Sequence, residues 1–408
     1  MIQIDKRTFL ESLSNVLDIS PSDYNLAVNR YNAVATYLKS QGIGADFYVQ
    51  GSFRLGTVIK PYKGDEDAAF DIDLVSQCHI NKQDTTPNEL KKHIGDVLKQ
   101  SGVYGNLTEE SRRCWTIEYA ENAGLGFHID VLPSVNEESS IKTNIANSMR
   151  ENPSLADTAI AITDKKNDGY CWTTSNPNGF ATYFDSVNAP FVNIVRSIEK
   201  KAIYEKNRNI YASIEAVPDL LVRTSLQRVI QILKYHRDVR FCRDPLCDDR
   251  PISMIITALT TEILKQHGFI AQDPYQLLLF VVSQLKKDAE LLNDKGLNEK
   301  SLSQLRGVRR DPSSKRWYIP NPVNPLENFA DKWNEQGSEK PKAFFQWVDW
   351  IEQDIIKGLE FYDENNMKTV FGENVLGRTL SQYNERIPKA PRVTIIDSQN
   401  TPSKPWMK

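Results

Sequence analysis

The sequence QGSFRLGTVIKPYKGDEDAAFDIDLV, residues 50–75, decides the fold of this chain. Its end alternates apolar and acidic side chains, which predicts a strand over 70–75. Because successive side chains of a strand point to opposite faces, Asp71 and Asp73 share one face. The apolar residues of this strand then face a core: Phe70, Ile72 and Leu74. Two carboxylates on one face of a strand are oxygen ligands of the kind that Mg²⁺ prefers, so the stretch predicts a divalent-metal site.

Residues on both sides of this strand complete the prediction. Upstream, Gly51-Ser52 allows a close backbone approach and supplies a hydroxyl, and the short helix expected after Ser52 would offer its N-terminal amides to phosphate. Downstream, residues 126–133 alternate as another strand and carry Asp130. If the two strands are neighbours, Asp130 lies beside the first two carboxylates. A metal site next to a phosphate-binding turn indicates nucleotidyl transfer.

Each part of this pattern is weak evidence alone, because Asp-x-Asp pairs are common at solvated strand ends. The combination is more specific, since carboxylates in apolar strands are costly to bury without cations. Asp71, Asp73 and Asp130 can hold two Mg²⁺ ions, with Mn²⁺ as a substitute. One ion would lower the pKa of a substrate hydroxyl, and the other would hold the triphosphate and the leaving oxygen. Such phosphoryl transfer needs positioning and charge neutralisation rather than a nucleophilic side chain.

Two further candidates for phosphate binding lie in the second half of the chain. Residues 220–240 form the strongest predicted helix and carry Lys234 among several arginines. A solvated helix face is the usual place for a lysine, whereas this neighbourhood favours a cluster that faces phosphate. Ser253, after Pro251, is expected to begin the next helix and to offer its hydroxyl or its amide to a phosphate.

Other polar patterns leave alternatives open. The spacing of His236, Cys242 and Cys247 admits zinc, but a fourth ligand is not apparent, and the alternative is a helix-end histidine with two buried thiols. His128 shares the strand face of Asp130, where a packed or hydrogen-bonded role is expected. The basic segment 309–316 is a lid over a nucleotide, an interaction patch or a solvated loop.

The chain of 408 residues is too long for a single ordinary core, which predicts two lobes. We expect a catalytic α/β lobe with N-terminal helices over 1–185, a mainly helical lobe over 186–390 and a flexible tail over 391–408. Residues 135–180 are rich in Asn, Ser, Thr and Asp, which predicts a long excursion with little regular structure. Residues 307–325 are basic and interrupted by proline, which predicts a loop.

The composition is that of a soluble globular protein, with 40% hydrophobic and 25% charged residues. The net charge of −3 gives no global basic field, so a nucleic-acid contact would need a local patch. No apolar run approaches the length of a membrane span, and the N-terminus lacks the apolar centre of a signal peptide. The five scattered cysteines fit reduced thiols better than disulfides. These features predict a cytoplasmic protein without a membrane contact.

The motifs that carry this chemistry resemble a known family. Gly51-Ser52, Asp71-x-Asp73 and Asp130 resemble the signature of polymerase-β-like nucleotidyltransferases. The longer motifs resemble the CD-NTases of CBASS anti-phage defence, which are bacterial cyclic-oligonucleotide synthases related to cyclic GMP–AMP synthase. These motifs are QGSFRLGT at 50–57, FDIDLV at 70–75, HIDVLP at 128–133, LQRVIQILKYHRD at 226–238, PIS at 251–253 and IPNPVNP at 319–325.

The resemblance implies a bilobed α+β fold, with the active site in the cleft between a mixed-sheet lobe and a helical lobe. It implies that the three aspartates hold the catalytic metal ions, and that nucleotide is bound by Gln50, Gly51, Ser52, Lys234 and Ser253. The implied reaction joins NTPs into a cyclic di- or trinucleotide second messenger and releases pyrophosphate. Expected partners are the NTP substrates, a CBASS effector that senses the product, and accessory regulatory proteins. The DNA-sensing zinc insertion of the animal enzyme is not recognisable, so activation by double-stranded DNA is not expected.

Two other functions remain open on the sequence. A linear-oligonucleotide synthase, or an enzyme of the same superfamily that modifies RNA or protein, would carry the same carboxylates. An RNA-tailing enzyme would more often have an extended basic surface. A non-catalytic nucleotide-binding protein on the same fold is disfavoured by the intact set of three aspartates.

Overall fold

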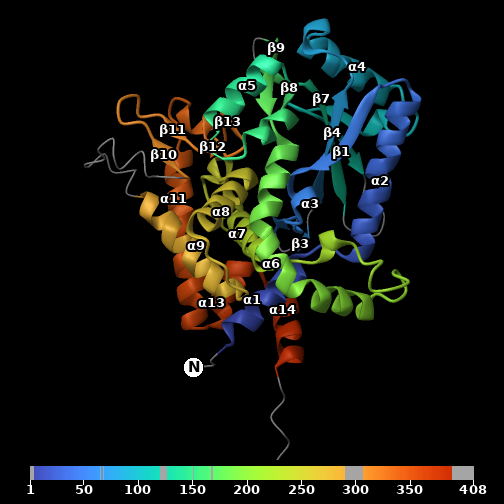
Figure 1. The fold of residues 1–408 in the computed structure, drawn as a ribbon. Coiled ribbons are helices and arrows are strands. Elements are labelled where there is room, and N and C mark those ends of the chain that lie inside the picture. Colours follow the sequence, from blue (N-terminus) through green and yellow to red (C-terminus); the bar gives the residue numbers. More distant parts are fainter. Residues whose placement is uncertain are drawn as a thin grey trace, which may run out of the picture.

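The structure is a computed structural model that describes residues 4–64, 66–67, 69–119, 126–149, 151–166, 169–289 and 307–387. Figure 1 shows a sheet with its helices beside a mainly helical part, which is yellow, orange and red in the drawing. The predicted α+β architecture is confirmed. Within the described ranges, no helix has both the length and the apolar character needed to cross a membrane.

A seven-stranded sheet forms the first lobe, with the order β1–β4–β7–β6–β5 and with β8 and β9 continuing from β7. Its strands are β1 (Ala45–Gln50), β4 (Phe70–Cys78), β5 (Thr108–Glu110), β6 (Trp115–Tyr119), β7 (Phe127–Asn136), β8 (Ile160–Lys166) and β9 (Gly169–Ser175). β4 and β7 pair in parallel, whereas the other neighbours are antiparallel. The strands predicted at 70–75 and 126–133 are therefore direct neighbours.

One face of the sheet packs against α2 (Pro21–Ser40) and α4 (Pro87–Lys99). Ile72 of β4 and Ile129 of β7 are fully buried in this core, together with Leu38 and Ile94 of the two helices. Because β4 alternates, its aspartates lie on the opposite face of the sheet. That face is left free to form a site.

The predicted starts of α2 and α4 are confirmed, and local sequence explains both. The Ser20 side chain accepts the backbone N–H of Asp23, while the Asp23 carboxylate accepts the backbone N–H of Ser20. Thr86 and Glu89 form the same reciprocal cap at α4. A proline follows each cap in the first turn, where its fixed φ suits a helix and its missing N–H costs nothing.

α7 (Ser225–Cys242) is the central helix of the second lobe, and all of its residues are buried except Arg240 and Cys242. Thr224 caps its start, so the helix predicted from residue 220 begins at Ser225. The other main helices of this lobe are α1 (Lys6–Leu17), α8 (Ser253–His267), α9 (Pro274–Asp288), α11 (Lys340–Ile351), α13 (Glu364–Phe371) and α14 (Glu373–Arg386). A π-helical segment (Glu352–Lys357) and α12 (Gly358–Glu360) continue α11.

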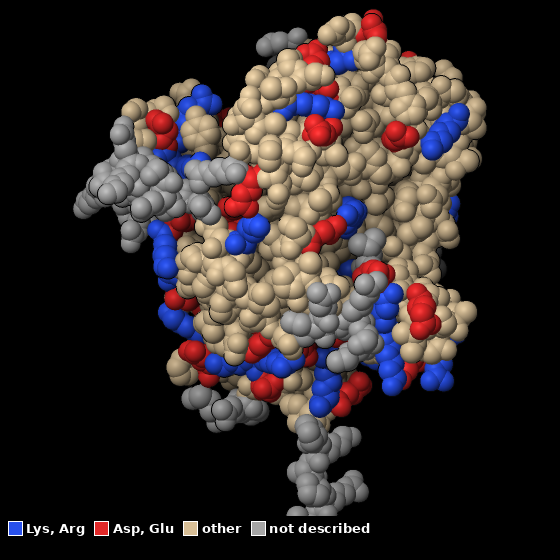
Figure 2. Space-filling view, in the orientation of Figure 1, with Lys and Arg blue, Asp and Glu red and all other residues tan. Residues whose placement is uncertain are grey.

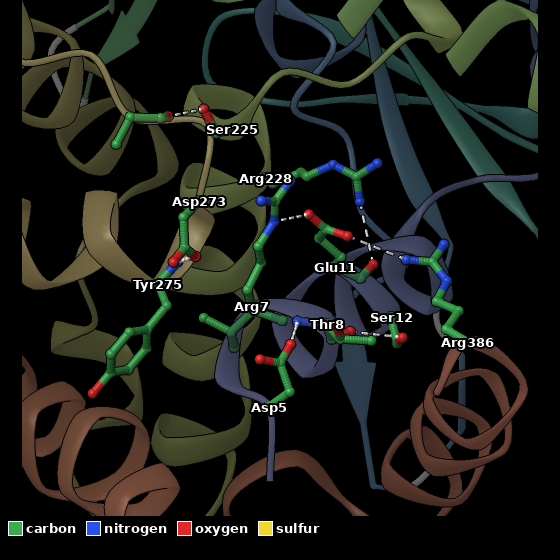
Figure 3. Close-up of polar contacts among 12 residues, drawn as sticks. Asp5, Arg7, Thr8, Glu11, Ser12, Ser225, Arg228, Asp273, Tyr275 and Arg386 are labelled. Carbon is green, nitrogen blue, oxygen red and sulfur yellow. Dashed lines mark hydrogen bonds and ion pairs between the residues drawn. The ribbon is translucent and has the colours of Figure 1, made fainter. Parts of the chain in front are cut away.

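α1 packs into the core of the helical lobe. Its Phe9 is fully buried in one cluster with residues of α7, α13 and α14. Figure 3 shows the polar contacts that accompany this packing. The Glu11 carboxylate accepts from Arg7 at 2.9 Å and from Arg386 at 3.4 Å, and its backbone carbonyl accepts from Arg228 at 3.2 Å. The first helix of the chain therefore joins segments that lie far from it in sequence.

The lobe boundary at residue 185 stays a prediction. α6 (Pro177–Lys206) is one continuous helix through that position, and Figure 1 shows it between the sheet and the helical part. The tail predicted at 391–408 lies outside the described residues. All five cysteines lie inside them, and none forms a disulfide.

Two predictions of irregular structure were wrong. Residues 135–180 contain α5 (Ser139–Ser148), a 3-10 helix (Pro153–Thr158), β8 and β9. Their polar residues serve partly as caps: the Asn176 side chain accepts the backbone N–H of Gly179 and starts α6. The predicted loop at 307–325 contains short pairs of strands. They are β10 (Arg309–Arg310) with β11 (Trp317–Tyr318), and β12 (Pro320–Asn321) with β13 (Asn324–Asn328).

Candidate active site

Three carboxylates meet on the free face of the sheet. Asp71 and Asp73 lie on β4, and Asp130 lies on β7. In the parallel register Asp73 is opposite Asp130, and Asp71 is opposite His128. Neighbouring strands lie about 4.8 Å apart, so Asp73 and Asp130 are close neighbours. The structure thus brings together the three residues that the sequence predicts for catalysis.

The charge of Asp130 disfavours the charged forms of Asp71 and Asp73. Burial raises the pKa of Asp73 to about 7, and the charges of Asp130 and Asp71 contribute to that shift. Desolvation and the Asp130 charge also raise the pKa of Asp71. The positive charge of Lys234 opposes both shifts. A cation among the carboxylates would relieve this repulsion.

The donor set fits magnesium, which takes carboxylate oxygens and usually completes its shell with water and substrate phosphates. Across the described ranges, no three acidic, histidine or cysteine side chains form a ready-made metal cluster. The fit therefore rests on the oxygen donors of Asp71, Asp73 and Asp130 and on their mutual repulsion. Metal binding by these three residues is a proposal rather than an observation.

Thr116 orients the third carboxylate and was not predicted from the sequence. It lies on β6, opposite Asp130 in the antiparallel register. Its hydroxyl donates to Asp130 Oδ1 at 2.6 Å. The signal was present in the alternation of this strand, because Trp115 and Ile117 are buried in the core and leave Thr116 on the other face.

The turn from β1 into α3 (Gly51–Leu55) lies directly against Asp73. Gln50, the last residue of β1, is opposite Asp73 in the register. Gly51 has a φ of +62°, and a Cβ built on it would lie 2.1 Å from Asp73 Oδ2. Only glycine suits such a position, because other residues rarely adopt this φ and no side chain fits there. Ser52 follows and lines the same cleft as Asp73.

Lys234 of α7 faces the aspartates from the helical lobe. It is buried, and its Nζ donates to the backbone carbonyl of Thr57 at 2.9 Å. Burial and the charge of Arg237 lower the pKa of Lys234 to about 8, although the nearby aspartates favour its charged form. The alternative of a solvated lysine is therefore wrong.

Ser253 begins α8, as predicted, and it contacts Arg237, one of the arginines of the predicted basic helix. Arg237 Nη1 donates to Ser253 Oγ at 3.1 Å and to the backbone carbonyl of Pro251 at 2.9 Å. Arg237 lies three positions after Lys234 and so shares its side of α7. Arg237 also pairs with the Asp238 carboxylate at 2.7 Å, so Lys234, Arg237, Asp238 and Ser253 form a polar wall of mixed charge opposite the aspartates.

A single cleft of about 790 Å³ joins these groups. All residues predicted for the site line it: Gln50, Gly51, Ser52, Asp71, Asp73, Asp130, Lys234 and Ser253. Arg237 of the predicted basic helix lines it as well, as do Asn321 and Phe329 from the segment that resembles a family loop near the cleft, and Arg113 and Glu327, which were not predicted. The two sets come from segments far apart in the chain, and pairing and packing bring them together.

The zinc alternative finds no support. His236 is fully buried, and its Nε2 lies 2.8 Å from the Asp354 carboxylate. Cys242 and Cys247 are exposed, so the prediction of two buried thiols was wrong. No metal cluster is present in the part of the chain that the structure describes.

Two other predicted positions lie apart from the carboxylate chemistry. Arg309 and Arg310 line a different hollow, of about 650 Å³, rather than the cleft that holds the aspartates. His128 stands opposite Asp71, but its Nδ1 is buried and has no hydrogen-bond partner among the described residues. Of the two expected roles for His128, packed or hydrogen-bonded, the second is not met at that atom, and the burial of this atom agrees with the first.

Known proteins share this architecture. Residues 45–133 match the family model described as cyclic GMP-AMP synthase DncV-like, nucleotidyltransferase domain. A protein of Roseivirga ehrenbergii named c-di-GMP synthase is 24% identical over 381 residues, which are 90% of this chain and 84% of that protein. The cyclic dinucleotide synthase CdnG of Bradyrhizobium diazoefficiens is 21% identical over 394 residues, which are 93% of this chain and 83% of that protein.

Solved structures share the fold. That of the Bradyrhizobium CD-NTase CdnG in complex with GTP has a TM-score of 0.67 at 17% identity, covering 93% of this chain and 99% of that chain. That of the complex of CdnC with HORMA-deltaN, from E. coli MS115-1, has a TM-score of 0.56 at 12% identity, covering 91% and 98%. The fold is that of a bilobed polymerase-β-like nucleotidyltransferase. The chain is similar to CD-NTases over most of its length, and residues 45–133 match the DncV-like nucleotidyltransferase domain.

Proposed function

We propose that this chain is a cyclic oligonucleotide synthase, which joins nucleoside triphosphates into a cyclic di- or trinucleotide and releases pyrophosphate. The observation that carries the proposal is the meeting of Asp71, Asp73 and Asp130 in one cleft with Lys234. The names of the two relatives, c-di-GMP synthase and cyclic dinucleotide synthase, support it. The complex of CdnG with GTP supports NTP binding in the cleft.

The polar wall of the cleft suits a triphosphate. Lys234 supplies positive charge where phosphoryl transfer develops negative charge, and Arg237, which pairs with Asp238, offers N–H donors at the same cleft. Gly51 has no side chain, so phosphate oxygens can approach its backbone. Ser52 and Ser253 offer hydroxyl groups at the same cleft. These residues bind and orient the substrate, and none of them has to act as a nucleophile.

The proposed cofactors are two Mg²⁺ ions held by Asp71, Asp73 and Asp130, with Mn²⁺ as a substitute. When bound, such ions lower the pKa of the attacking hydroxyl and neutralise the triphosphate. The protein fixes the ligands from two sides, because Thr116 holds Asp130 and the turn at Gly51 lies against Asp73. Pre-positioned carboxylates reduce the reorganisation that the reaction requires.

The test is to incubate the protein with all four NTPs and Mg²⁺, treat the products with phosphatase, and determine their masses. A phosphatase-resistant product with the mass of a cyclic di- or trinucleotide is expected. The matched control is the double variant Asp71→Asn with Asp73→Asn, which keeps the shape of both side chains and should consume no NTP. Chelation by EDTA should stop turnover, and added Mg²⁺ should restore it. A product that phosphatase degrades, as a linear oligonucleotide, would overturn the proposal.

No observation favours a linear or RNA-tailing activity. On the face drawn in Figure 2, lysines and arginines are interspersed with aspartates and glutamates, without an extended basic tract. The net charge of −3 agrees with that surface. A long nucleic acid would need a continuous positive surface for its phosphates.

The remaining expectations concern the setting of the enzyme. The complex of CdnC with HORMA-deltaN supports a search for an accessory regulatory protein of this chain. A CBASS effector that senses the cyclic product during phage infection is the proposed downstream partner. Location in the cytoplasm stays a prediction.

A further inference from the structure

Two carboxylates line the cleft besides the three aspartates of the proposed metal site: Asp238, which pairs with Arg237 at 2.7 Å, and Glu327. Glu327 of β13 lines the same cleft as the three catalytic aspartates. Its Oε2 accepts from Asn321 Nδ2 at 2.8 Å, and the Ser175 hydroxyl lies 3.4 Å from each of its oxygens. Each carboxylate oxygen has two lone pairs, so both can accept further hydrogen bonds.

Among the described residues, no ion pair balances the charge of Glu327. In the described part of the chain, no lysine or arginine forms an ion pair with Glu327 within 4.0 Å. Arg113 lies near enough for its charge to lower the pKa of Glu327, but its ion pair is with Asp164, at 3.6 Å. Burial acts in the opposite direction and raises that pKa. A desolvated carboxylate without such compensation is costly, so a ligand that donates hydrogen bonds would stabilise it.

The surrounding segments fix where Glu327 points. Asn321 Oδ1 accepts the backbone N–H of Val323 at 3.0 Å, which turns the Asn321 amide nitrogen toward Glu327. Asn176, at the start of α6, donates to the backbone carbonyl of Val323 at 3.2 Å. The β12–β13 pair is thus tied to α6, and the carboxylate is positioned before a ligand binds. Such preorganisation is what recognition of a defined group requires.

Two phenylalanines also line this cleft. Phe329 and Phe180 lie edge to face, with ring centroids 6.5 Å apart. Both are packed in the hydrophobic core, with exposed fractions of 9% and 3%, so they leave no open ring face for a base to stack on. Recognition of a base in this part of the cleft therefore depends on a polar group that reads its edge, and Glu327 is an acceptor for that purpose.

We propose that Glu327 recognises guanine, which makes GTP a substrate of this enzyme. The inference rests on the proposed function, namely that the cleft binds NTPs. A carboxylate only accepts hydrogen bonds. Guanine has two adjacent donors on its Watson–Crick edge, N1–H and the N2 amino group. Adenine and cytosine have a ring acceptor beside the amino group, and uracil has one N–H between two carbonyls. Guanine therefore matches both oxygens of Glu327, whereas the other bases do not.

The test measures binding of the α,β-imido analogues of GTP, ITP and ATP, which cannot release pyrophosphate, by calorimetry in the presence of Mg²⁺. Inosine lacks only the N2 amino group of guanine. A hydrogen bond to a charged group is worth roughly tenfold to a hundredfold in affinity, so the native protein should bind the guanine analogue tighter than the inosine analogue by about that factor. Glu327→Gln should bring this ratio close to one, because the glutamine amide donor faces a donor on guanine. The same variant should gain affinity for the adenine analogue, since glutamine pairs with adjacent donor and acceptor atoms of adenine.

Asp331→Asn is the matched control. Asp331 is exposed, lies four positions after Glu327 and does not line the cleft, so its variant removes a nearby charge without changing base recognition. The inference is overturned if Glu327→Gln keeps the native guanine-to-inosine ratio. It is also overturned if the native protein binds both analogues equally, a result that does not depend on how the variant folds. If Glu327→Gln loses the guanine preference as expected but the native protein makes a linear product, only the proposed function is rejected. If the native protein makes a cyclic product but Glu327→Gln keeps the native guanine-to-inosine ratio of affinities, only the role of Glu327 is rejected.

Discussion

Replacing Gly51 by alanine tests how the fold positions the carboxylate of Asp73. The new Cβ would lie 2.1 Å from Asp73 Oδ2, whereas ordinary contact begins at 3.4 Å. One of the two groups must therefore move by about 1.3 Å. β4 is held between β1 and β7, so its backbone cannot yield, and the Asp73 side chain or the start of α3 has to shift.

The substitution has two effects that can be measured separately. A φ of +62° costs an L-residue about 1–2 kcal/mol, which lowers the melting temperature by a few degrees. The displacement of Asp73 acts on turnover instead. A misplacement of about 1 Å at a reacting centre costs on the order of 100-fold in rate. Gly51→Ala should therefore reduce turnover by about two orders of magnitude while the protein stays folded.

Gly268→Ala is the matched control, because Gly268 has a φ of +57° and a Cβ added there would meet no atom within 4 Å. Both variants should lose similar thermal stability in calorimetry. Only Gly51→Ala should lose pyrophosphate release from NTPs with Mg²⁺. If the two variants differ in turnover by less than about fivefold, the approach of Gly51 to Asp73 does not position the carboxylate, and the reasoning is refuted.

Three further variants test other contacts. Thr116→Val removes the hydroxyl that donates to Asp130 at 2.6 Å, so turnover should fall roughly tenfold or more with little change in melting temperature; unchanged turnover would contradict the orienting role. Lys234→Met removes the buried cation beside the aspartates and should raise the KM for NTP about tenfold or more in steady-state assays; an unchanged KM would exclude phosphate binding by Lys234. Asp288→Asn tests an effect on stability. Burial raises the pKa of Asp288 from 3.8 to about 7, so with rising pH the unfolded chain releases this proton before the folded protein does. The free energy of unfolding therefore falls as the pH rises from about 4 to 7. The variant lacks that loss, and its gain in denaturant unfolding should be larger at pH 8 than at pH 5 by about 2–3 kcal/mol, because only the two pH units from 5 to 7 contribute; equal gains at both pH values would contradict the shift.

The three aspartates could be predicted from the sequence because their arrangement depends mainly on local strand geometry. Strand alternation alone places Asp71 and Asp73 on one face, and a second alternating segment supplies Asp130. Only one assumption was long-range, namely that the two strands are neighbours, and the parallel register confirms it. The starts of α2 and α4 were predictable for the same reason, since each cap involves residues three positions apart.

Residues whose placement depends on long-range pairing could not be predicted. Thr116 faces Asp130 only because β6 pairs antiparallel with β7. Glu327 meets Ser175 across 152 positions of sequence, through a pair of short strands that the proline-rich segment concealed. Arg237 was visible as part of a basic helix, but its contact with Ser253 required the packing of α7 against α8. Polar composition predicted irregular structure at 135–180 because strand-forming Ile and Thr residues of β8 and β9 were outnumbered.

α7 explains why the two lobes form one site. Gln227, Gln231 and Lys234 lie on one side of this helix, spaced four and three residues apart. Each donates to a backbone carbonyl of residues 55–58, directly after the turn that approaches Asp73, at 2.8–2.9 Å. These carbonyls follow a helix of five residues that cannot satisfy them by itself. The helical lobe thus holds the turn at Gly51 in place. Lys234 contributes in two ways, because it supports that turn by a hydrogen bond and brings positive charge to the carboxylates. The position of the aspartates relative to the turn is therefore set by side chains about 175 residues away, which is why a strand pattern predicts the metal ligands but not the cleft that uses them.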